Sequence, residues 1–380
     1  MSPFFSPNTG GVETFLDDLI KFLNKNDEGA TVISYKPLTT KIDAPFLEKN
    51  NGNTIYRLPW IKFMLFYRLE KYKLAQLVYL SLGIGVFSFF HWLTGRMSKH
   101  KVVHCHGMAA GFVGYLLSFI SRKKFVLNFH TNYRFSKESL VGKFIRIMCK
   151  RYDEILVLSN ACKSNLIEIG IPANKITTYY NWIDEDVFSI IDKNVAREKL
   201  NLDKDAFYAL FVGRFSKEKG IFDLLESVPD MNKNTNLIII GGGMGEDRVA
   251  NVASENKNVV YIGRKNSEEL ALYFNAADVL AYAPIDEDYL GRVAISALSC
   301  GLPIMIPGTT FYGGVETKTV LEIPEKIGVV FKNDPISFAQ SLNKMIEKSD
   351  FDRNACREYA QGIYGENVNG LIFLKALRID

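Results

Sequence analysis

The sequence is poor in cysteine and histidine, and neither residue is spaced as a disulfide framework or a zinc site requires. Among the 380 residues are five cysteines and five histidines. The cysteines are scattered, odd in number and without Cys-x-x-Cys spacing, which indicates reduced thiols and a cytoplasmic protein. A secretory signal peptide is not recognisable either, because Met1 leads directly into Ser-Pro-Phe-Phe-Ser-Pro. Secreted disulfide-rich domains and zinc fingers are therefore not expected.

Acidic residues are scarce in the first part of the chain. Residues 1–150 hold 21 Lys and Arg against 9 Asp and Glu, whereas residues 151–380 hold 25 against 33. Such an asymmetry predicts that the N-terminal half meets an anionic partner, either nucleic acid or a membrane surface. We expect the membrane and no nucleic-acid partner, because of the segment that follows.

Formal charge is absent from Leu74 to Leu93, a stretch long enough to cross a bilayer. A single crossing would separate strands that should belong to one sheet, so a spanning helix is not expected. The preceding residues, 56–73, interleave basic and aromatic side chains, as segments in anionic membrane interfaces do. We therefore predict that residues 57–93 associate peripherally with the cytoplasmic face of a membrane. The alternative is an ordinary surface helix whose aromatic side chains pack on the core.

Patterns typical of buried strands and amphipathic helices alternate along both halves of the chain. This alternation predicts an α/β protein with parallel sheets covered by helices on both faces. We place an N-terminal domain at residues 1–185, a C-terminal domain at 186–360 and a C-terminal helix at 361–380 that returns toward the N-terminal domain. In length and composition the chain is sufficient for two cores.

The most informative segment is 212–220, which reads Val-Gly-Arg-Phe-Ser-Lys-Glu-Lys-Gly. It follows an apolar run at 208–212 and precedes a helical pattern. A glycine turn at the tip of a buried strand thus displays Arg214 and Lys219. An Arg fork, a Lys point charge and a helix N-terminus together favour a diphosphate. Taken alone, the segment is equally explained as a solvated basic loop.

Further motifs follow in order, and together they resemble family 4 of the retaining glycosyltransferases. They are Gly-Arg then Lys-Gly at 213–220, Gly-Gly-Gly at 241–243, Ala-Ala-Asp-Val at 276–279, Ala-Leu-Ser-Cys-Gly-Leu-Pro at 297–303, Gly-Gly-Val-Glu at 313–316 and Glu-Asn-Val at 366–368. The resemblance covers nearly the whole chain. It implies the GT-B fold, in which two Rossmann-like, doubly wound domains face a cleft. It also implies transfer of a sugar from a nucleotide diphosphate with retention of anomeric configuration.

The resemblance assigns roles to particular residues. It implies that the catalytic group comprises His130, Arg214, Lys219 and Asp288. Donor binding is expected from Gly10, Gly11, Gly213, Gly243, Gly263, Arg264, Leu290, Gly291, Arg292, Val293 and Ser296. Sugar or acceptor contacts are expected from His104, His106 and Arg134. Because fixed cations and N–H groups stabilise the leaving diphosphate, we expect no metal and no cofactor besides the nucleotide-sugar co-substrate.

Three features depart from the family pattern. The family carries two glutamates where this chain has Asp288 and Ser296. Asp288 keeps the charge, whereas Ser296 cannot accept two ribose hydroxyl bonds as a carboxylate does, which weakens donor binding by about 1.5–3 kcal/mol. The run at 286–288, Asp-Glu-Asp, imitates a metal motif of another fold, which we take as a coincidence. The buried first strand that opens family members is also missing before Gly10.

We interpret the chain as a retaining hexosyltransferase that uses a lipid-linked or glycan acceptor, as in the assembly of surface polysaccharide such as lipopolysaccharide or O-antigen. The alternative from another class is a non-catalytic subunit that binds a nucleotide sugar or a partner. Ser296 and the missing strand favour that alternative, while Arg214, Lys219 and His130 oppose it. A sugar 2-epimerase of similar fold is a further rival, but its sequence order around the donor site differs.

Overall fold

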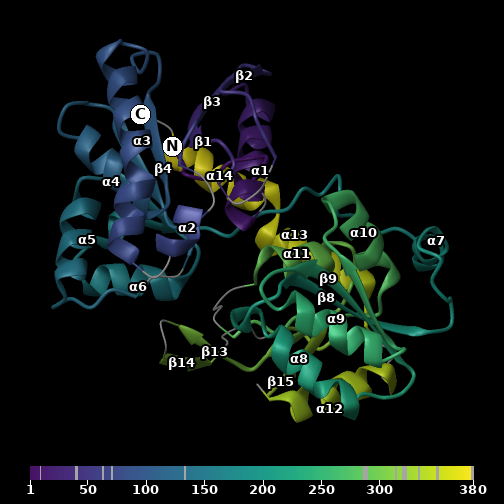
Figure 1. The fold of residues 1–380 in the computed structure, drawn as a ribbon. Coiled ribbons are helices and arrows are strands. Elements are labelled where there is room, and N and C mark those ends of the chain that lie inside the picture. Colours follow the sequence, from purple (N-terminus) through teal and green to yellow (C-terminus); the bar gives the residue numbers. More distant parts are fainter. Residues whose placement is uncertain are drawn as a thin grey trace. The chain divides into compact units, whose positions relative to one another are not determined.

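The computed structural model describes the chain in two compact units. The described residues are 1–380 without 9, 39–41, 62–63, 70–71, 132–133, 286–289, 313–314, 319–322, 333, 348–350 and 378–380. The N-terminal unit comprises Met1–Asn181 and Asn369–Asp380, and the C-terminal unit is Trp182–Val368 (Figure 1). Sequence reasoning had placed the boundaries at 185/186 and 360/361.

The N-terminal unit alternates strands and helices. Its elements are α1 (Gly11–Lys25), β1 (Thr31–Tyr35), β2 (Leu47–Asn50), β3 (Asn53–Leu58), α2 (Met64–Leu69), α3 (Lys73–Leu93), β4 (Val102–His106), α4 (Gly107–Leu117), β5 (Lys124–Asn128), α5 (Leu140–Lys150), β6 (Glu154–Val157), α6 (Asn160–Glu168), a 3₁₀ turn (Ala173–Lys175) and β7 (Ile176–Thr178). The strands form two sheets, ordered β1-β3-β2 and β4-β5-β6-β7. All pairs are parallel except β2 with β3.

Residues 1–2 link the two sheets. The Met1 amino group donates to the His104 carbonyl oxygen at 2.6 Å, and the His106 N–H donates to the Met1 carbonyl at 2.9 Å. On the other side, the Ser2 N–H donates to the Ile33 carbonyl at 3.1 Å. In the described part of the chain, β1 and β4 are edge strands and α1 is the first element, so no strand precedes Gly10. Met1 and Ser2 thus make the contacts that a strand between β1 and β4 would make.

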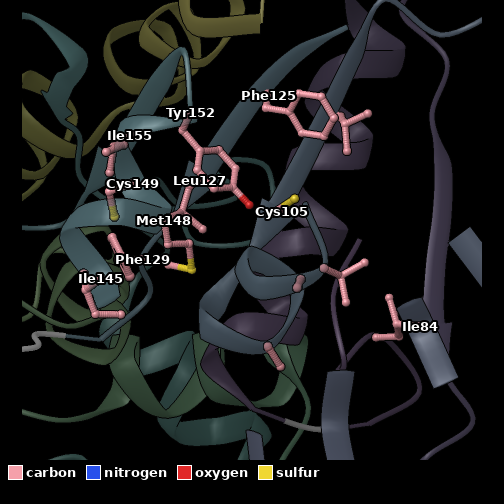
Figure 2. Close-up of a cluster of buried hydrophobic side chains, with 14 of the residues drawn as sticks. Ile84, Cys105, Phe125, Leu127, Phe129, Ile145, Met148, Cys149, Tyr152 and Ile155 are labelled. Carbon is pink, nitrogen blue, oxygen red and sulfur yellow. The ribbon is translucent and has the colours of Figure 1, made fainter. Parts of the chain in front are cut away.

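Part of the core of this unit lies between the sheet β4-β5-β6-β7 and helices α4 and α5. Figure 2 shows the side chains of Phe125 and Leu127 from β5 beside Met148 and Tyr152. Leu127, Met148 and Tyr152 are at most 1% exposed, and the Tyr152 hydroxyl donates to the Gly111 carbonyl at 2.5 Å. The continuous apolar run of β5 therefore predicts correctly a strand that is covered by helices.

Helix α3 is the long uncharged segment of the sequence. Among the described residues it is the one helix long and apolar enough to cross a membrane by length and composition. One of its faces, however, is buried in the N-terminal unit, where Tyr79, Ile84, Ser88 and His91 contact the rest of the unit. The opposite face is exposed. α3 is therefore a helix of the folded unit with an exposed apolar side.

The C-terminal unit contains a second parallel sheet. Its elements are α7 (Lys193–Lys199), β8 (Phe207–Arg214), a 3₁₀ turn (Lys217–Lys219), α8 (Ile221–Ser227), a second 3₁₀ turn (Val228–Asp230), β9 (Thr235–Gly242), α9 (Glu246–Glu255), β10 (Val259–Gly263), α10 (Ser267–Ala276), β11 (Val279–Ala281), α11 (Arg292–Ser299), β12 (Ile304–Pro307), β13 (Thr309–Tyr312), β14 (Val315–Lys318), β15 (Gly328–Phe331), α12 (Pro335–Glu347) and α13 (Arg353–Tyr364). The sheet order is β10-β9-β8-β11-β12-β15, and β13 with β14 forms a separate antiparallel pair. The last helix, α14 (Glu366–Leu377), contributes its residues from Asn369 onward to the N-terminal unit.

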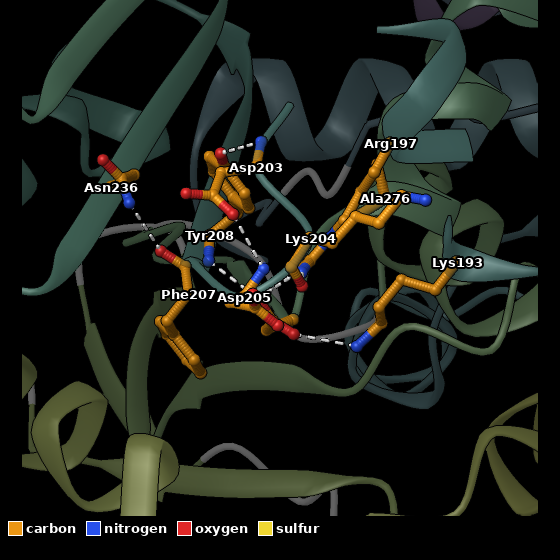
Figure 3. Close-up of polar contacts among 10 residues, drawn as sticks. Lys193, Arg197, Asp203, Lys204, Asp205, Phe207, Tyr208, Asn236 and Ala276 are labelled. Carbon is orange, nitrogen blue, oxygen red and sulfur yellow. Dashed lines mark hydrogen bonds and ion pairs between the residues drawn. The ribbon is translucent and has the colours of Figure 1, made fainter. Parts of the chain in front are cut away.

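Ion pairs between Asp278 and two basic residues of α7 fix this helix to the second sheet. Asp278 accepts from the Arg197 guanidinium at 2.7 Å, from Lys193 Nζ at 2.8 Å and from the Tyr208 N–H at 2.7 Å. In Figure 3 the side chains of Lys193 and Arg197 lie near the backbone of Tyr208. Arg197 is only 3% exposed and also donates to the Ala276 and Lys204 carbonyls, so its charge is fully paired. These ion pairs thus hold α7 against the starts of β8 and β11.

Candidate functional site

Three loops of the C-terminal unit meet at one edge of its sheet. Strands β8, β9 and β11 are parallel and adjacent, so the loops that follow them emerge at their carboxyl ends. This edge is where open α/β sheets bind ligands. The sequence analysis assigned Arg214, Lys219 and Gly243 to one donor-binding region. All three lie at the end of β8 or in the loops that follow β8 and β9.

The first loop carries the predicted cations. Arg214 is the last residue of β8 and is exposed, and Lys219 ends the 3₁₀ turn and is half-buried. Gly220 follows with φ +71°, and a Cβ at this position would lie 1.9 Å from the Ala283 carbonyl oxygen. The Ile285 N–H donates to the Glu218 carbonyl at 2.9 Å. The Arg–Lys turn is therefore held directly against the loop that follows β11.

The second loop is the glycine turn after β9, and it interlocks with the first. Gly241 has φ +149°, and a Cβ there would lie 1.8 Å from the carbonyl oxygen of Gly213. The Phe215 N–H donates to the Gly242 carbonyl at 3.0 Å. Glycine is required here because two backbones touch. The structure thus brings the predicted residue Gly213, near the end of β8, beside the glycine turn that carries Gly243.

Arg264 adds a third cation near this turn. It follows Gly263, the last residue of β10, and is exposed; a Cβ on Gly242 would lie 2.9 Å from its Nε atom. Beside it the Tyr261 hydroxyl donates to Glu246 at 2.6 Å. Burial, and then the bond to Glu246, raises the pKa of Tyr261 to about 12. Sequence reasoning missed Glu246 and Tyr261, since a lone Glu and a strand Tyr carry no motif.

The third loop leads into α11. Asp288 lies outside the described residues, whereas Leu290 is 1% exposed and packs in the core. The Gly291 N–H, predicted as a phosphate donor, donates to the Tyr282 hydroxyl at 3.0 Å. Arg292 donates to the Trp182 carbonyl at 2.9 Å. The described ends of this segment, Tyr282 and Gly291, are therefore joined by a hydrogen bond.

Val293 and Ser296 lie on α11, within its first two turns. Ser296 is 5% exposed, and its neighbours along the helix, Ile295 and Ala297, are fully buried. Helix α11 itself, Arg292–Ser299, carries no carboxylate side chain. Ser296, where the sequence departs from the family pattern, is therefore a buried position on α11.

In the N-terminal unit, Gly10 and Gly11 form the start of α1. Gly10 is extended, and Glu13 folds back under it, so that a Cβ on Gly10 would lie 2.5 Å from a Glu13 carboxyl oxygen. Burial raises the pKa of Glu13. The predicted close-approach glycines therefore sit at a helix N-terminus that already carries a buried carboxyl group.

The predicted histidines come together at the carboxyl ends of β4 and β5. His106 Nδ1 lies 2.9 Å from His130 Nε2, and the rings of His104 and His106 are 4.0 Å apart between centroids. The Asn128 amide nitrogen lies 2.9 Å from His130 Nε2 and donates to the Tyr179 hydroxyl at 2.9 Å. Arg134, which follows His130 in the sequence, is exposed. Asn128 and Tyr179 were not predicted, because each is a single polar residue in an apolar strand or turn.

The histidine cluster is electrically neutral at physiological pH. Burial is the main cause that lowers the pKa of His104 and His106, and it lowers the pKa of His130 from 6.5 to about 3. The pKa of the Met1 amino group is lowered by burial as well. Among the described residues, no group of three or more His, Cys, Asp or Glu side chains is arranged to hold a metal ion. The cluster is thus suited to hydrogen bonding by neutral imidazoles.

Comparisons with known proteins match the N-terminal and C-terminal parts of the chain to two separate family models. The family model described as "Glycosyltransferase Family 4" matches residues 9–187, and that described as "Glycosyl transferases group 1" matches residues 192–362. Together these two matches cover nearly the whole chain.

Two relatives and one solved structure illustrate the likeness. An uncharacterised glycosyltransferase of Methanocaldococcus jannaschii is 26% identical over 92% of this chain and 87% of its own length. Alpha-monoglucosyldiacylglycerol synthase of Acholeplasma laidlawii is 27% identical over 56% of this chain and 59% of its own length. The structure of Anabaena HepE in complex with UDP-glucose has a TM-score of 0.70 at 18% identity, with 99% of both chains covered. With nearly its whole length matched by the two family models, and with the fold of these enzymes, the chain belongs to the family 4 glycosyltransferases of the GT-B fold.

Proposed function

We propose that the protein transfers a hexose-type sugar, with retention of configuration, from a nucleotide-diphosphate sugar to a lipid-linked or glycan acceptor. The observation that carries the proposal is the cationic turn at the β8 edge. Arg214, Lys219 and Arg264 supply positive charge where three strand ends meet, and the interlocked glycine turns let backbone approach a diphosphate. The HepE complex with UDP-glucose supports a nucleotide-sugar donor.

The chemistry follows from the charge of the leaving group. Departure of a sugar leaves a nucleotide diphosphate with added negative charge, so fixed cations stabilise the transition state more than the ground state. Arg214 and Lys219 do this without a protein nucleophile, and we expect no requirement for a metal. Because burial lowers the pKa of His130 to about 3, a neutral ring is expected there, which does not serve as a general acid at physiological pH. Its expected role is a hydrogen bond to the transferred sugar, as the family resemblance implies.

A transfer assay tests the proposal. Purified protein, labelled nucleotide sugars and a lipid extract should give labelled, organic-soluble product, and the anomeric configuration of that product should match the donor. Arg214→Ala and Lys219→Ala should each abolish transfer. Lys217→Ala is the matched control, since it removes an exposed lysine from the same turn and should keep transfer within about three-fold.

Two outcomes would change the proposal. Loss of activity with EDTA and recovery with Mn²⁺ would overturn metal independence. Donor binding without transfer or hydrolysis would favour the non-catalytic subunit instead, for which the replacement of the second family glutamate by Ser296 is the specific observation.

We further propose that the exposed face of α3 docks on an anionic membrane at the cytoplasmic side. Its apolar side chains recur every four residues and are 50–75% exposed, namely Leu74, Val78, Leu82, Val86 and Phe90. Exposed basic residues lie at both ends of the helix: Lys73 is its first residue, and Arg96 and Lys99 follow it. Insertion of the apolar side chains into the membrane favours binding. Pairing of the basic side chains with anionic lipids favours it further, by about 1 kcal/mol per cation.

The structure also narrows the predicted membrane segment of residues 57–93. Arg57 is 4% exposed and bonds to Glu48 at 2.7 Å and to the Ser6 carbonyl at 2.8 Å, so it does not contribute to the surface. Trp60 stacks on Tyr35 at 5.1 Å. Lys62 and Lys71 lie outside the described residues. The docking surface we propose is therefore α3 itself.

Sedimentation with lipid vesicles tests this surface. The protein should bind vesicles that contain anionic lipid and release them at high salt. Replacing Leu82 and Val86 together by Glu should reduce binding at least ten-fold. Val330→Glu, at a 52% exposed position of the C-terminal unit, is the control and should bind as the unaltered protein does. Equal binding by all three proteins, or no binding at all, would refute the docking surface.

A further inference from the structure

Helices α4 and α5 expose apolar side chains outside the segment 57–93. Because β4, β5 and β6 are parallel and adjacent in chain order, right-handed connections place α4 and α5 on one face of their sheet. On α5, Leu140 is 85% exposed and Ile147 is 55% exposed. Both share one side of the helix with the half-buried Phe144, at spacings of four and three residues. At the end of α4, Leu116 and Phe119 are 51% and 59% exposed.

Ring contacts connect the exposed side chains of the two helices. The Phe144 ring lies 5.9 Å from Phe112 and 6.3 Å from Tyr115 between centroids, which packs α5 on α4. Phe119 lies 5.1 Å from Tyr115, and the Arg151 guanidinium lies over the Phe119 ring at 4.4 Å. One apolar surface, the α4–α5 surface, thus comprises Leu116, Phe119, Leu140, Phe144 and Ile147. Exposed apolar side chains that gather in this way mark interaction sites more than scattered ones do.

The α4–α5 surface continues the exposed side of α3. The Ser81 hydroxyl of α3 donates to the Ala109 carbonyl of α4 at 3.2 Å. One turn further along, a Cβ on Gly85 would lie 3.4 Å from a methyl group of Val113, so the two helices pack closely (Figure 1). The three helices therefore form one layer, in which each helix exposes apolar side chains.

The charges around this layer are almost all positive. Residues 71–150 hold 13 Lys and Arg and a single acidic residue, Glu138. Three of these cations, Lys143, Arg146 and Lys150, are exposed on α5 beside its apolar side chains. In the part of the chain that the structure describes, the ion pairs include none of these three residues. Their charges are therefore available to an anionic partner.

We propose that α3, α4 and α5 form one membrane-facing layer, and that the N-terminal unit docks on an anionic bilayer with these helices parallel to the bilayer plane. The proposal rests on the docking of α3 proposed above and extends it to a second surface. Apolar side chains beside basic ones fit a bilayer, which takes up the former and pairs with the latter. A nucleic acid would pair with the cations and leave Leu140 and Ile147 in water.

Sedimentation with vesicles of phosphatidylcholine and phosphatidylglycerol tests the α4–α5 surface. Leu140→Glu with Ile147→Glu should lower the partition coefficient of the full chain at least ten-fold, because two apolar contacts are lost and two negative charges are added. Lys143→Gln with Lys150→Gln should lower it by about five-fold for each cation removed. Ile336→Glu, at a 61% exposed position of α12, is the matched control and should bind as the unaltered protein does.

Spin labels measure contact with lipid directly. The five cysteines are buried, so a nitroxide reagent should attach at an introduced, exposed cysteine. Labels at Leu116→Cys and Ile147→Cys should become more accessible to oxygen and less accessible to a water-soluble nickel chelate when the anionic vesicles are added. A label at Ile336→Cys should show no change. Misfolding does not produce this pattern, so the labels separate lipid contact from a loss of structure.

Several results would overturn the proposal. Undiminished vesicle binding by folded Leu140→Glu with Ile147→Glu would confine docking to α3, and so would labels at positions 116 and 147 that stay accessible to the chelate in the bound protein. Displacement from vesicles by duplex DNA at equal phosphate concentration would assign the cations to nucleic acid. No vesicle binding by the unaltered protein would overturn the α3 proposal as well. Failure of sugar transfer would instead appear as no donor binding, with the vesicle results unchanged.

Discussion

Replacing Gly220 by alanine should disrupt the contact between the cationic turn, residues 214–220, and the loop after β11. Gly220 has φ +71°, and an alanine Cβ would lie 1.9 Å from the Ala283 carbonyl oxygen. Real Cβ contacts rarely come below 3.0 Å, so the two loops would have to separate by about 1.1 Å. The hydrogen bond from Ile285 N–H to the Glu218 carbonyl joins the same loops and would be strained or lost.

The magnitude can be divided into two parts. A left-handed backbone costs an alanine about 1–2 kcal/mol, and forcing packed backbone apart costs about 1–3 kcal/mol more. Gly263→Ala isolates the first part, because Gly263 has φ +84° and nothing within 4 Å of its would-be Cβ. We therefore expect Gly220→Ala to lose about 2–5 kcal/mol and Gly263→Ala to lose only about 1–2 kcal/mol.

Urea titration followed by hydrogen exchange of the β8 and β9 amides measures the stability of the C-terminal unit alone. The same variants should be tested for donor affinity, which should fall at least ten-fold in Gly220→Ala because Lys219 moves with the turn. Equal losses of stability in both variants would refute the reasoning, since the steric contact would then contribute nothing.

Further predictions concern charge and pH. Asp278→Asn should cost the C-terminal unit about 3 kcal/mol in urea unfolding, because Arg197 stays buried without its carboxylate; a loss below about 1 kcal/mol would contradict this. Ser296→Glu should tighten donor binding about ten-fold in titration calorimetry by restoring a carboxylate to α11, and an unchanged Kd in a folded protein would argue against a ribose contact at this position. Since the pKa values of His104, His106 and His130 are lowered by burial, the unfolded chain binds more protons than the folded one below pH 6.5. The free energy of unfolding of the N-terminal unit should therefore fall as pH drops from 6.5 toward 3, by at most about 1.4 kcal/mol per pH unit for each histidine. His130→Gln should make this dependence on pH less steep. An equally steep dependence in His130→Gln would contradict the lowered pKa of His130.

The alternation of apolar runs with helical patterns was sufficient to predict most of the fold. The runs at 125–129, 208–212 and 237–240 are strands, because each is a short apolar stretch that ends in polar or glycine residues. Strands β2 and β3 were missed. The sequence of β2, Leu-Glu-Lys-Asn, is mostly exposed and carries no apolar alternation, and β3 runs into the basic and aromatic residues that were interpreted as a membrane segment. The link that Met1 and Ser2 make between β1 and β4 depends on tertiary contacts that no local pattern encodes.

The candidate site was predictable where chemistry depends on residue type and spacing. Arg214, Lys219 and the glycines of the two turns fall in adjoining loops, as their order after the strands implied. The contact of the Gly291 N–H with Tyr282 and the support of His130 by Asn128 could not be predicted, because both pairs depend on side-chain direction rather than on sequence spacing. The acidic run at 286–288 falls on residues that lie outside the described ones.

Binding of a nucleotide-sugar donor to the Arg214–Lys219 turn is the central claim, and thermal stabilisation measures it most directly. The purified protein should be tested against UDP-, GDP- and ADP-sugars in detergent, beside Arg214→Ala and the Lys217→Ala control. The account predicts a rise in Tm with donors of one nucleotide, retained in Lys217→Ala and lost in Arg214→Ala. No rise with any donor, in a protein shown to be folded, would contradict it.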